Sequence, residues 1–260
     1  MEQAIYIVDA FTDKLFCGNP AAVCPLENWL DDSLMQRIAA ENNLAETAFF
    51  VKEKGGYRIR WFTPEVEVDL CGHATLAASF VFFNFIDKNA ERIVYNSQSG
   101  ELIVDKEGSL ISLNFPSQKP MPVDKPEEFV INAFDVKPNE VLMGTKRFLV
   151  YETEEIIRNM KPNMGMLKNL EGDGVIITAR GNEVDFVSRF FAPNIGIDED
   201  PVTGSAHTHL IPYWSEKLNK KKMTALQISA RGGTLYCEDL GQRVKISGKA
   251  VLYSHGKIFL

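Results

Sequence analysis

One local pattern occurs twice in this 260-residue chain, about half its length apart. Arg60-Trp61-Phe62-Thr63-Pro64 is the first copy, and Arg189-Phe190-Phe191-Ala192-Pro193 is the second. In each copy a short acidic loop leads to a Gly that opens an apolar helical run. From Arg60 to Gly72 is 12 positions, and from Arg189 to Gly204 is 15. The repeat predicts two similar halves, each with a strand, a loop and a helix N-terminus; the alternative is a chance likeness between two unrelated units.

The two predicted helix N-termini indicate where a ligand would bind. The first N–H groups of a helix have no partner within the helix, and the helix dipole is positive there, so this end attracts anions. If the two halves face each other, the helices that begin at Gly72 and Gly204 direct their N-termini into one cleft. The repeat therefore predicts a site for a small anion between two lobes.

A proline-rich segment lies between the two copies of the repeat. Residues 116–126 contain four prolines in 11 positions. Because proline lacks an N–H group and restricts φ, this segment cannot be an interior strand or helix. We interpret it as a linker. We expect an N-terminal lobe of residues 1–117, completed by a C-terminal strand near 251–260, and a C-terminal lobe of residues 118–250.

Hydrophobic periodicity predicts an α+β fold rather than alternating βαβ units. Each lobe is expected to be a mostly antiparallel sheet wrapped around one long apolar helix, over residues 73–84 in the first lobe and 205–218 in the second. Another helix is expected over residues 32–41, and Lys106-Glu107-Gly108 predicts a hairpin turn. The other expected strands are residues 5–10, 45–52, 58–63, 147–151, 175–180 and 184–191.

Composition argues against several kinds of partner. A net charge of −7 and a pI near 5.3 argue against a nucleic-acid-binding surface. The longest apolar stretch, residues 74–83, is too short to span a bilayer. No secretory signal is visible, and the four cysteines form no CxxC pair, so we expect a reduced, cytoplasmic protein. No phosphate-binding glycine motif is found, and His207 and His209 point to different sides of a helix, so neither a nucleotide cofactor nor a metal is expected.

Three titratable side chains are candidates for catalysis. Glu46 stands alone in an apolar strand-like run, where a buried carboxylate suits acid/base chemistry; the alternative is an edge-strand Glu that points to solvent. His73 opens the first long helix, whose dipole favours a neutral imidazole; the alternative is a residue that only caps the backbone. Asp200 precedes the second long helix, where acidic residues also act as caps.

Ser205 is a candidate nucleophile with a weak signal. Thr203-Gly204-Ser205-Ala206 is not the G-x-S-x-G pattern of a nucleophile elbow. A triad of Ser205, His73 and Asp200 would make a serine hydrolase, but a Ser in the first helical turn offers its backbone N–H more readily than its hydroxyl. A serine hydrolase is therefore the alternative enzyme, and a catalytically silent small-molecule binding protein is the alternative to an enzyme.

Five segments follow one another along nearly the whole chain: Asp9-Ala10-Phe11-Thr12, Phe16-Cys17-Gly18-Asn19-Pro20-Ala21-Ala22-Val23, Asn43-Leu44-Ala45-Glu46-Thr47-Ala48-Phe49, Cys71-Gly72-His73-Ala74-Thr75 and Glu199-Asp200-Pro201-Val202-Thr203-Gly204-Ser205-Ala206-His207. In this order they resemble the phenazine biosynthesis-like (PhzF-like) proteins. The resemblance implies a diaminopimelate-epimerase-like fold, with two pseudo-symmetric lobes and a site for a small carboxylate substrate between them. It also implies a homodimer.

The resemblance further implies a reaction. The characterised member of the family, the isomerase of the phenazine pathway, moves a proton within a dihydro-hydroxyanthranilate without a metal or an organic cofactor. The site residues that it implies are Glu46 as the acid/base group, His73 and Asp200 as further catalytic groups, and Gly72, Gly204 and Ser205 as substrate-binding positions.

One departure from related enzymes bears on the mechanism. Related epimerases and racemases use two cysteines on opposite faces of the substrate; Cys71 falls at or near the first position, and Ser205 at the second. A serine hydroxyl is too weak an acid to act as an unaided base near neutral pH. We therefore expect a one-base proton transfer by Glu46, with Cys71 as a further candidate.

Overall fold

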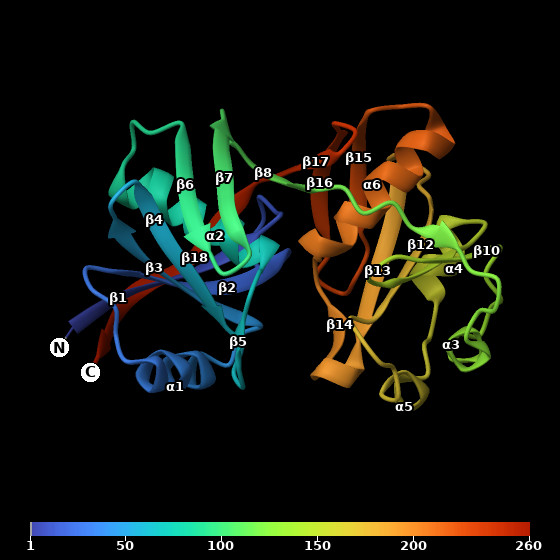
Figure 1. The fold of residues 1–260 in the computed structure, drawn as a ribbon, viewed down its shortest axis with the longest axis horizontal. Coiled ribbons are helices and arrows are strands. Elements are labelled where there is room, and N and C mark those ends of the chain that lie inside the picture. Colours follow the sequence, from blue (N-terminus) through green and yellow to red (C-terminus); the bar gives the residue numbers. More distant parts are fainter. Residues whose placement is uncertain (1) are drawn as a thin grey trace. The chain divides into compact units, whose positions relative to one another are not determined.

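The computed structural model describes residues 2–260 and separates into two compact units, each rich in strands and poor in helices (Figure 1). The first unit consists of Met1–Asn114 with Ser247–Leu260, and the second of Phe115–Ile246. This architecture agrees with the predicted strand-rich α+β class. No helix within the described residues is long and apolar enough to cross a membrane.

The first unit contains nine strands and two α-helices within the described residues. They are β1 (Glu2–Ala10), β2 (Asn19–Leu26), α1 (Asp32–Asn42), β3 (Glu46–Glu53), β4 (Gly56–Phe62), β5 (Glu67–Val68), α2 (Gly72–Val81), β6 (Arg92–Ser97), β7 (Gly100–Glu107), β8 (Leu110–Pro116) and β18 (Ala250–Phe259). β18 is antiparallel to β1 along its length, from Phe259 opposite Glu2 to Ala250 opposite Ala10. The two ends of the sequence therefore share one sheet.

The second unit contains the remaining strands and α-helices of the described residues. They are β9 (Met121–Pro122), α3 (Glu128–Asn132), β10 (Glu140–Met143), β11 (Arg147–Val150), α4 (Glu154–Asn159), α5 (Met164–Leu167), β12 (Val175–Arg180), β13 (Phe186–Ala192), β14 (Ile197–Asp200), α6 (Gly204–Leu218), β15 (Lys222–Gln227), β16 (Gly233–Asp239) and β17 (Arg243–Gly248). After Pro116 the proline-rich segment contains one regular element, the two-residue strand β9, as expected where proline removes backbone donors.

The strands of the two units pair in the same order. In the first unit β1 is antiparallel to β2, β2 is parallel to β3, β3 is antiparallel to β4, and β4 is parallel to β6. In the second unit the same order holds for β10, β11, β12, β13 and β15. The short strands β5 and β14 add antiparallel hairpins to β4 and β13. The parallel strand pairs therefore occur at equivalent positions in the strand orders of the two units.

The repeated Arg stabilises this hairpin in each unit. Arg60 on β4 donates two hydrogen bonds of 2.7 Å to the Glu67 carboxylate. Arg189 on β13 donates two, of 2.7 and 2.9 Å, to Glu199. Each guanidinium also lies over the ring of the phenylalanine two positions further on. The Arg and Glu are seven positions apart in the first copy and ten in the second, so the extra residues of the second copy lie in this loop. The two copies build one structural motif twice.

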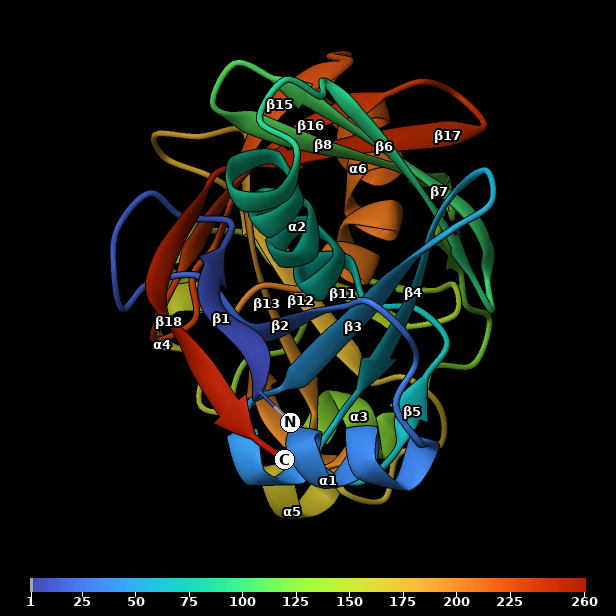
Figure 2. The same cartoon turned by 90° about the vertical axis from the view of Figure 1, so that its left-hand side faces the viewer.

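Helix α2 lies in the core of the first unit (Figure 2). Every residue from His73 to Ser79 is buried, and the helix packs against β1, β2, β3 and β18. A helix that is apolar on all sides must be covered on all sides. The predicted helix over residues 73–84 ends earlier, at Val81, and continues as a π-helical turn, Phe82–Ile86. This turn buries the consecutive Phe82 and Phe83 together.

Candidate active site

Glu46 is the first residue of β3 and lies beside Ala21 of the parallel strand β2. The five residues that follow it are buried, so this strand carries its carboxylate into apolar surroundings. The Glu46 side chain is 12% exposed. The interpretation of Glu46 as a residue that points to solvent is therefore wrong.

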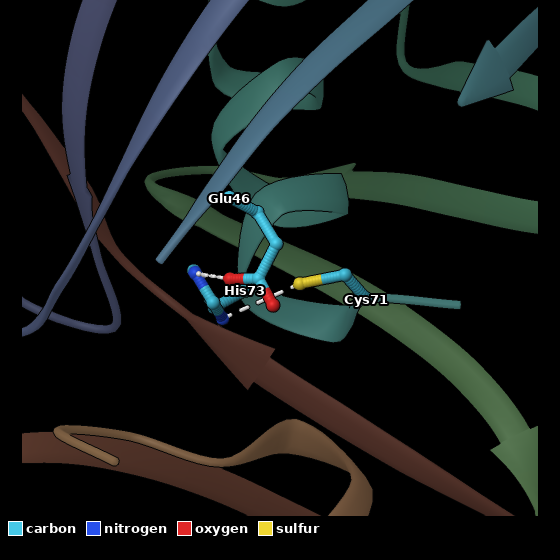
Figure 3. A group of neighbouring side chains, drawn as sticks. All are labelled: Glu46, Cys71 and His73. Carbon is cyan, nitrogen blue, oxygen red and sulfur yellow. Dashed lines mark hydrogen bonds and ion pairs between the residues drawn. The ribbon is translucent and has the colours of Figure 1, made fainter. Parts of the chain in front are cut away.

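His73 is the second residue of α2, and its imidazole contacts three other side chains. Nε2 lies 3.0 Å from Oε2 of Glu46. Nδ1 lies 3.4 Å from Sγ of Cys71 and 3.2 Å from Nδ2 of Asn19. Figure 3 shows the contacts of the two ring nitrogens, one with the Glu46 carboxylate and the other with the Cys71 sulfur. The start of α2 positions both Cys71 and His73, because Cys71 is its N-cap residue.

The charge state of this cluster follows from burial and from the neighbouring acid. Burial alone would lower the pKa of His73, but the adjacent Cys71 and Glu46 raise it well above its ordinary value. Burial, with the nearby Glu46 charge, raises the pKa of the Cys71 thiol. These directions favour an imidazolium paired with a carboxylate, next to a neutral thiol. The helix dipole predicts a neutral His73, whereas Cys71 and the carboxylate on β3 favour its charged form.

Asn19 is a site residue to which the sequence analysis assigned no role. It is fully buried at the start of β2. Gly18 before it has a φ of +69°, and a Cβ atom there would lie 2.2 Å from the carbonyl oxygen of Ala10. Only glycine permits this turn, which carries the Asn19 amide to His73. The available signal was a Gly-Asn pair at the beginning of an apolar strand.

The predicted residues of the second unit lie around the start of α6. Asp200 is the last residue of β14 and is 8% exposed. The Thr203 hydroxyl, at the N-cap of α6, donates a hydrogen bond to the Asp200 carboxylate. Gly204 opens the helix, and Ser205 is exposed in its first turn. These residues form a group within the second unit, whereas Glu46, Cys71, Gly72 and His73 form a group within the first.

Gln227 holds the residues around the start of α6 in place, and this role was not predicted from the sequence. This side chain is 1% exposed at the end of β15. Its Oε1 accepts a hydrogen bond of 2.8 Å from the N–H of Thr203. Its Nε2 donates to the carbonyl oxygen of Asp200, at 2.7 Å, and to the Thr203 hydroxyl, at 3.0 Å. A polar residue at a strand end carries no local signal of such a role.

The histidines of α6 give Ser205 no general base. Nδ1 of His207 lies 2.9 Å from the carbonyl oxygen of Thr203, and Nε2 of His209 lies 3.2 Å from the N–H of Thr145. Burial lowers the pKa of both imidazoles to about 4. Among the described residues of the second unit, neither ring forms a hydrogen bond with the Ser205 hydroxyl.

Known proteins resemble this chain over its full length. A family model described as phenazine biosynthesis-like protein matches residues 8–256. Two proteins of Pseudomonas aeruginosa, each named an uncharacterized isomerase, are 49% and 52% identical over 260 and 261 residues, with 100% of each sequence covered. A crystal structure of a PhzF-family phenazine biosynthesis protein from Enterococcus faecalis matches with a TM-score of 0.97 at 49% identity, covering 100% of both chains. A hydroxyproline epimerase from Agrobacterium vitis, solved with trans-4-OH-L-proline bound, shares the fold at a TM-score of 0.66 and 9% identity, covering 99% of this chain and 91% of the epimerase chain.

Proposed function

Since the chain belongs to the phenazine biosynthesis-like (PhzC-PhzF) protein family, we propose that it is a cofactor-independent isomerase in which Glu46 moves a proton within a small carboxylate-bearing substrate. The relatives named isomerases support the reaction class. The observation that carries the assignment to Glu46 is the buried contact of 3.0 Å between its carboxylate and the His73 imidazole. A buried carboxylate with a proton donor beside it is suited to exchange protons with a substrate.

The proposed reaction has two steps at one carboxylate. Glu46 takes a proton from an activated C–H bond, and the electron pair of that bond stays on the substrate. Glu46, now a carboxylic acid, returns the proton to a different atom of the same molecule. Once Glu46 is neutral, the His73 imidazolium is free to stabilise the negative charge that develops on the substrate.

The state of Cys71 supports a one-base mechanism. A two-base epimerisation needs a thiolate on the far side of the substrate from the second base. Burial is the first cause that raises the pKa of Cys71, and this direction favours a thiol over a thiolate. We therefore assign the proton transfer to Glu46 and place Cys71 in the surroundings of His73.

Two observations support a carboxylate-bearing substrate. The first N–H groups of α2, at Gly72 and His73, have no partner within the helix, and such a helix start favours an anion. The epimerase that shares this fold was solved with an amino acid bound. Contacts from Asp200, Gly204 and Ser205 to the substrate, a pseudo-symmetric pair of lobes, homodimer formation and a cytoplasmic location stay predictions from the family resemblance.

Deuterium exchange tests the proposal across a range of candidate substrates at once. The protein is incubated in D₂O with a panel of small carboxylic acids of cyclohexadiene and amino-acid types, and label is measured by mass spectrometry. Glu46→Gln keeps the shape of the side chain and removes the base, so exchange should fall by about 10²–10⁴-fold. Glu41→Gln, at an exposed position of α1, is the control and should exchange like wild type.

Two results would contradict the proposal. One is near-wild-type exchange by a folded Glu46→Gln protein. The other is tight binding of a panel compound, measured by calorimetry, without any exchange by wild type. The second result would identify the chain as a binding protein that uses the same residues without catalysis.

A further inference from the structure

Three side chains of different chemistry converge at the start of α2. One ligand atom each from Glu46, Cys71 and His73 can be chosen so that all three lie within 4.8 Å of one another. Figure 3 shows the carboxylate and the sulfur next to the imidazole ring, each in contact with a different ring nitrogen. Carboxylate oxygen, thiolate sulfur and imidazole nitrogen together are the donor types that bind Zn²⁺ in proteins. We propose that this cluster is a binding site for Zn²⁺ or a similar borderline-soft divalent cation.

The spacing of sulfur and nitrogen matches a tetrahedral zinc site. With Zn–S near 2.3 Å and Zn–N near 2.0–2.1 Å, two ligands of a tetrahedral ion lie about 3.5 Å apart. Sγ of Cys71 and Nδ1 of His73 are 3.4 Å apart. An ion bound between them replaces the present contact of Nδ1 with the Asn19 amide, which lies 3.2 Å away. Glu46 becomes a ligand by turning its carboxylate away from Nε2, which it now contacts at 3.0 Å, toward this ion. The helix start thus presents two ligands at the distance that the ion needs.

Electrostatics favours a divalent over a monovalent cation in the cluster of Glu46, Cys71 and His73. The side chains of Glu46 and His73 are only 12% and 6% exposed, and Cys71 is 7% exposed. A net charge buried to this extent is costly unless it is neutralised. One dication, one carboxylate, one thiolate and one neutral imidazole sum to zero. Binding releases the Cys71 thiol proton and any second proton of His73 to solvent, and a water molecule takes the fourth position.

The ion would act as an inhibitor, and this consequence rests on the proposed function. Glu46 cannot take a proton from a substrate while its oxygen is a metal ligand, and coordinated His73 cannot be an imidazolium. Metal binding itself does not depend on the reaction. The two statements therefore have separate tests.

Cobalt spectroscopy tests the binding site directly. Wild-type protein, free of affinity tags and under argon, is titrated with Co²⁺. One equivalent should produce a near-ultraviolet thiolate-to-cobalt band with the visible bands of tetrahedral cobalt, and Zn²⁺ should displace both. Cys71→Ala should lose the thiolate band. Cys237→Ala removes an equally buried thiol on β16 of the second unit and should behave like wild type.

A second variant separates ligand loss from misfolding. Glu46→Gln keeps both Cys71 and His73, so the thiolate band should persist while the affinity for Zn²⁺ falls at least about tenfold. The proposal is overturned if wild type shows no thiolate band, if the band survives in Cys71→Ala, or if Cys237→Ala abolishes it. If Zn²⁺ binds with these signatures but leaves deuterium exchange unchanged, the metal site stands and the catalytic role of Glu46 fails.

Discussion

At the scale of single residues, Cys71 and Glu46 beside the buried His73 favour the protonated form of its imidazole. The carboxylate comes from β3 and the imidazole from α2, and the two meet in buried surroundings. A histidine whose folded-state pKa is raised binds its proton more tightly in the folded protein than in the unfolded chain. The pair therefore stabilises the fold fully below the unfolded pKa of about 6.5, and this contribution is lost as the pH rises through the folded pKa.

This pairing predicts a specific titration of His73. In two-dimensional NMR the His73 ring signals should titrate above the ordinary histidine pKa of about 6.5. In Glu46→Gln the His73 midpoint should move down, because a neutral amide replaces the charge that favours the imidazolium. An unchanged midpoint in that variant would show that Glu46 does not control the protonation of His73.

His207 predicts the opposite dependence on pH. It is fully buried on α6, where burial lowers its pKa to about 4. The unfolded chain therefore takes up a proton that the folded protein rejects, and stability is lost as the pH falls from about 6.5 toward 4. This lowering of the His207 pKa corresponds to a loss of the order of 3 kcal/mol in the free energy of unfolding.

Urea unfolding at several pH values checks this prediction. The free energy of unfolding of wild type should fall between pH 6.5 and 4, and His207→Asn should show a smaller fall. His209, whose pKa is also about 4, still contributes to the fall in the free energy of unfolding of that variant. His255→Gln, at an exposed position, should follow wild type. Equal slopes for wild type and His207→Asn would contradict the assignment.

At the scale of secondary-structure elements, the start of α6 depends on β15. Gln227 on that strand satisfies the N–H of Thr203 and the carbonyl of Asp200. Gln227→Leu keeps the volume but leaves these buried groups without a partner, which costs about 1–3 kcal/mol each. Gln242→Leu, at an exposed position, should change stability by less than about 0.5 kcal/mol. The two variants are compared by urea unfolding, and equal stabilities would show that β15 does not hold the helix start.

At the scale of the whole molecule, the C-terminal strand belongs to the first unit. β18 pairs with β1 over its full length and packs against α2. Deletion of residues 250–260 removes this strand and exposes one edge of β1. Hydrogen exchange with mass spectrometry should then show fast exchange in peptides of residues 2–114 and retained protection in residues 115–246. Deletion of Leu260 alone, beyond the end of β18, is the control. Uniform loss of protection in both units would show that they fold as one.

The sequence predicted the elements that depend on local spacing. The helix α1, the hairpin of β7 and β8, and the long helix α6 were all predicted close to their observed ranges. Each of them is encoded by the period of its apolar residues and by turn residues at its ends. The π-helical turn after Val81 was not predicted, because it depends on how Phe82 and Phe83 pack against the surrounding strands.

The sequence by itself determined that this chain contains one motif twice, with an Arg-bearing strand end, an acidic loop and a helix that begins at Gly, because these features are local and recur at nearly the same spacing. It also marked Glu46 and His73 as candidates, since each is a polar residue at an apolar element. Only the tertiary structure decided that these two groups meet, that Asn19 reaches His73 from 54 positions away, and that Gln227 holds Asp200 from 27 positions away. The reason is physical: such contacts depend on the order and register of strands, and an alternation of apolar and polar residues specifies which face of a strand is buried but not which strand lies beside it.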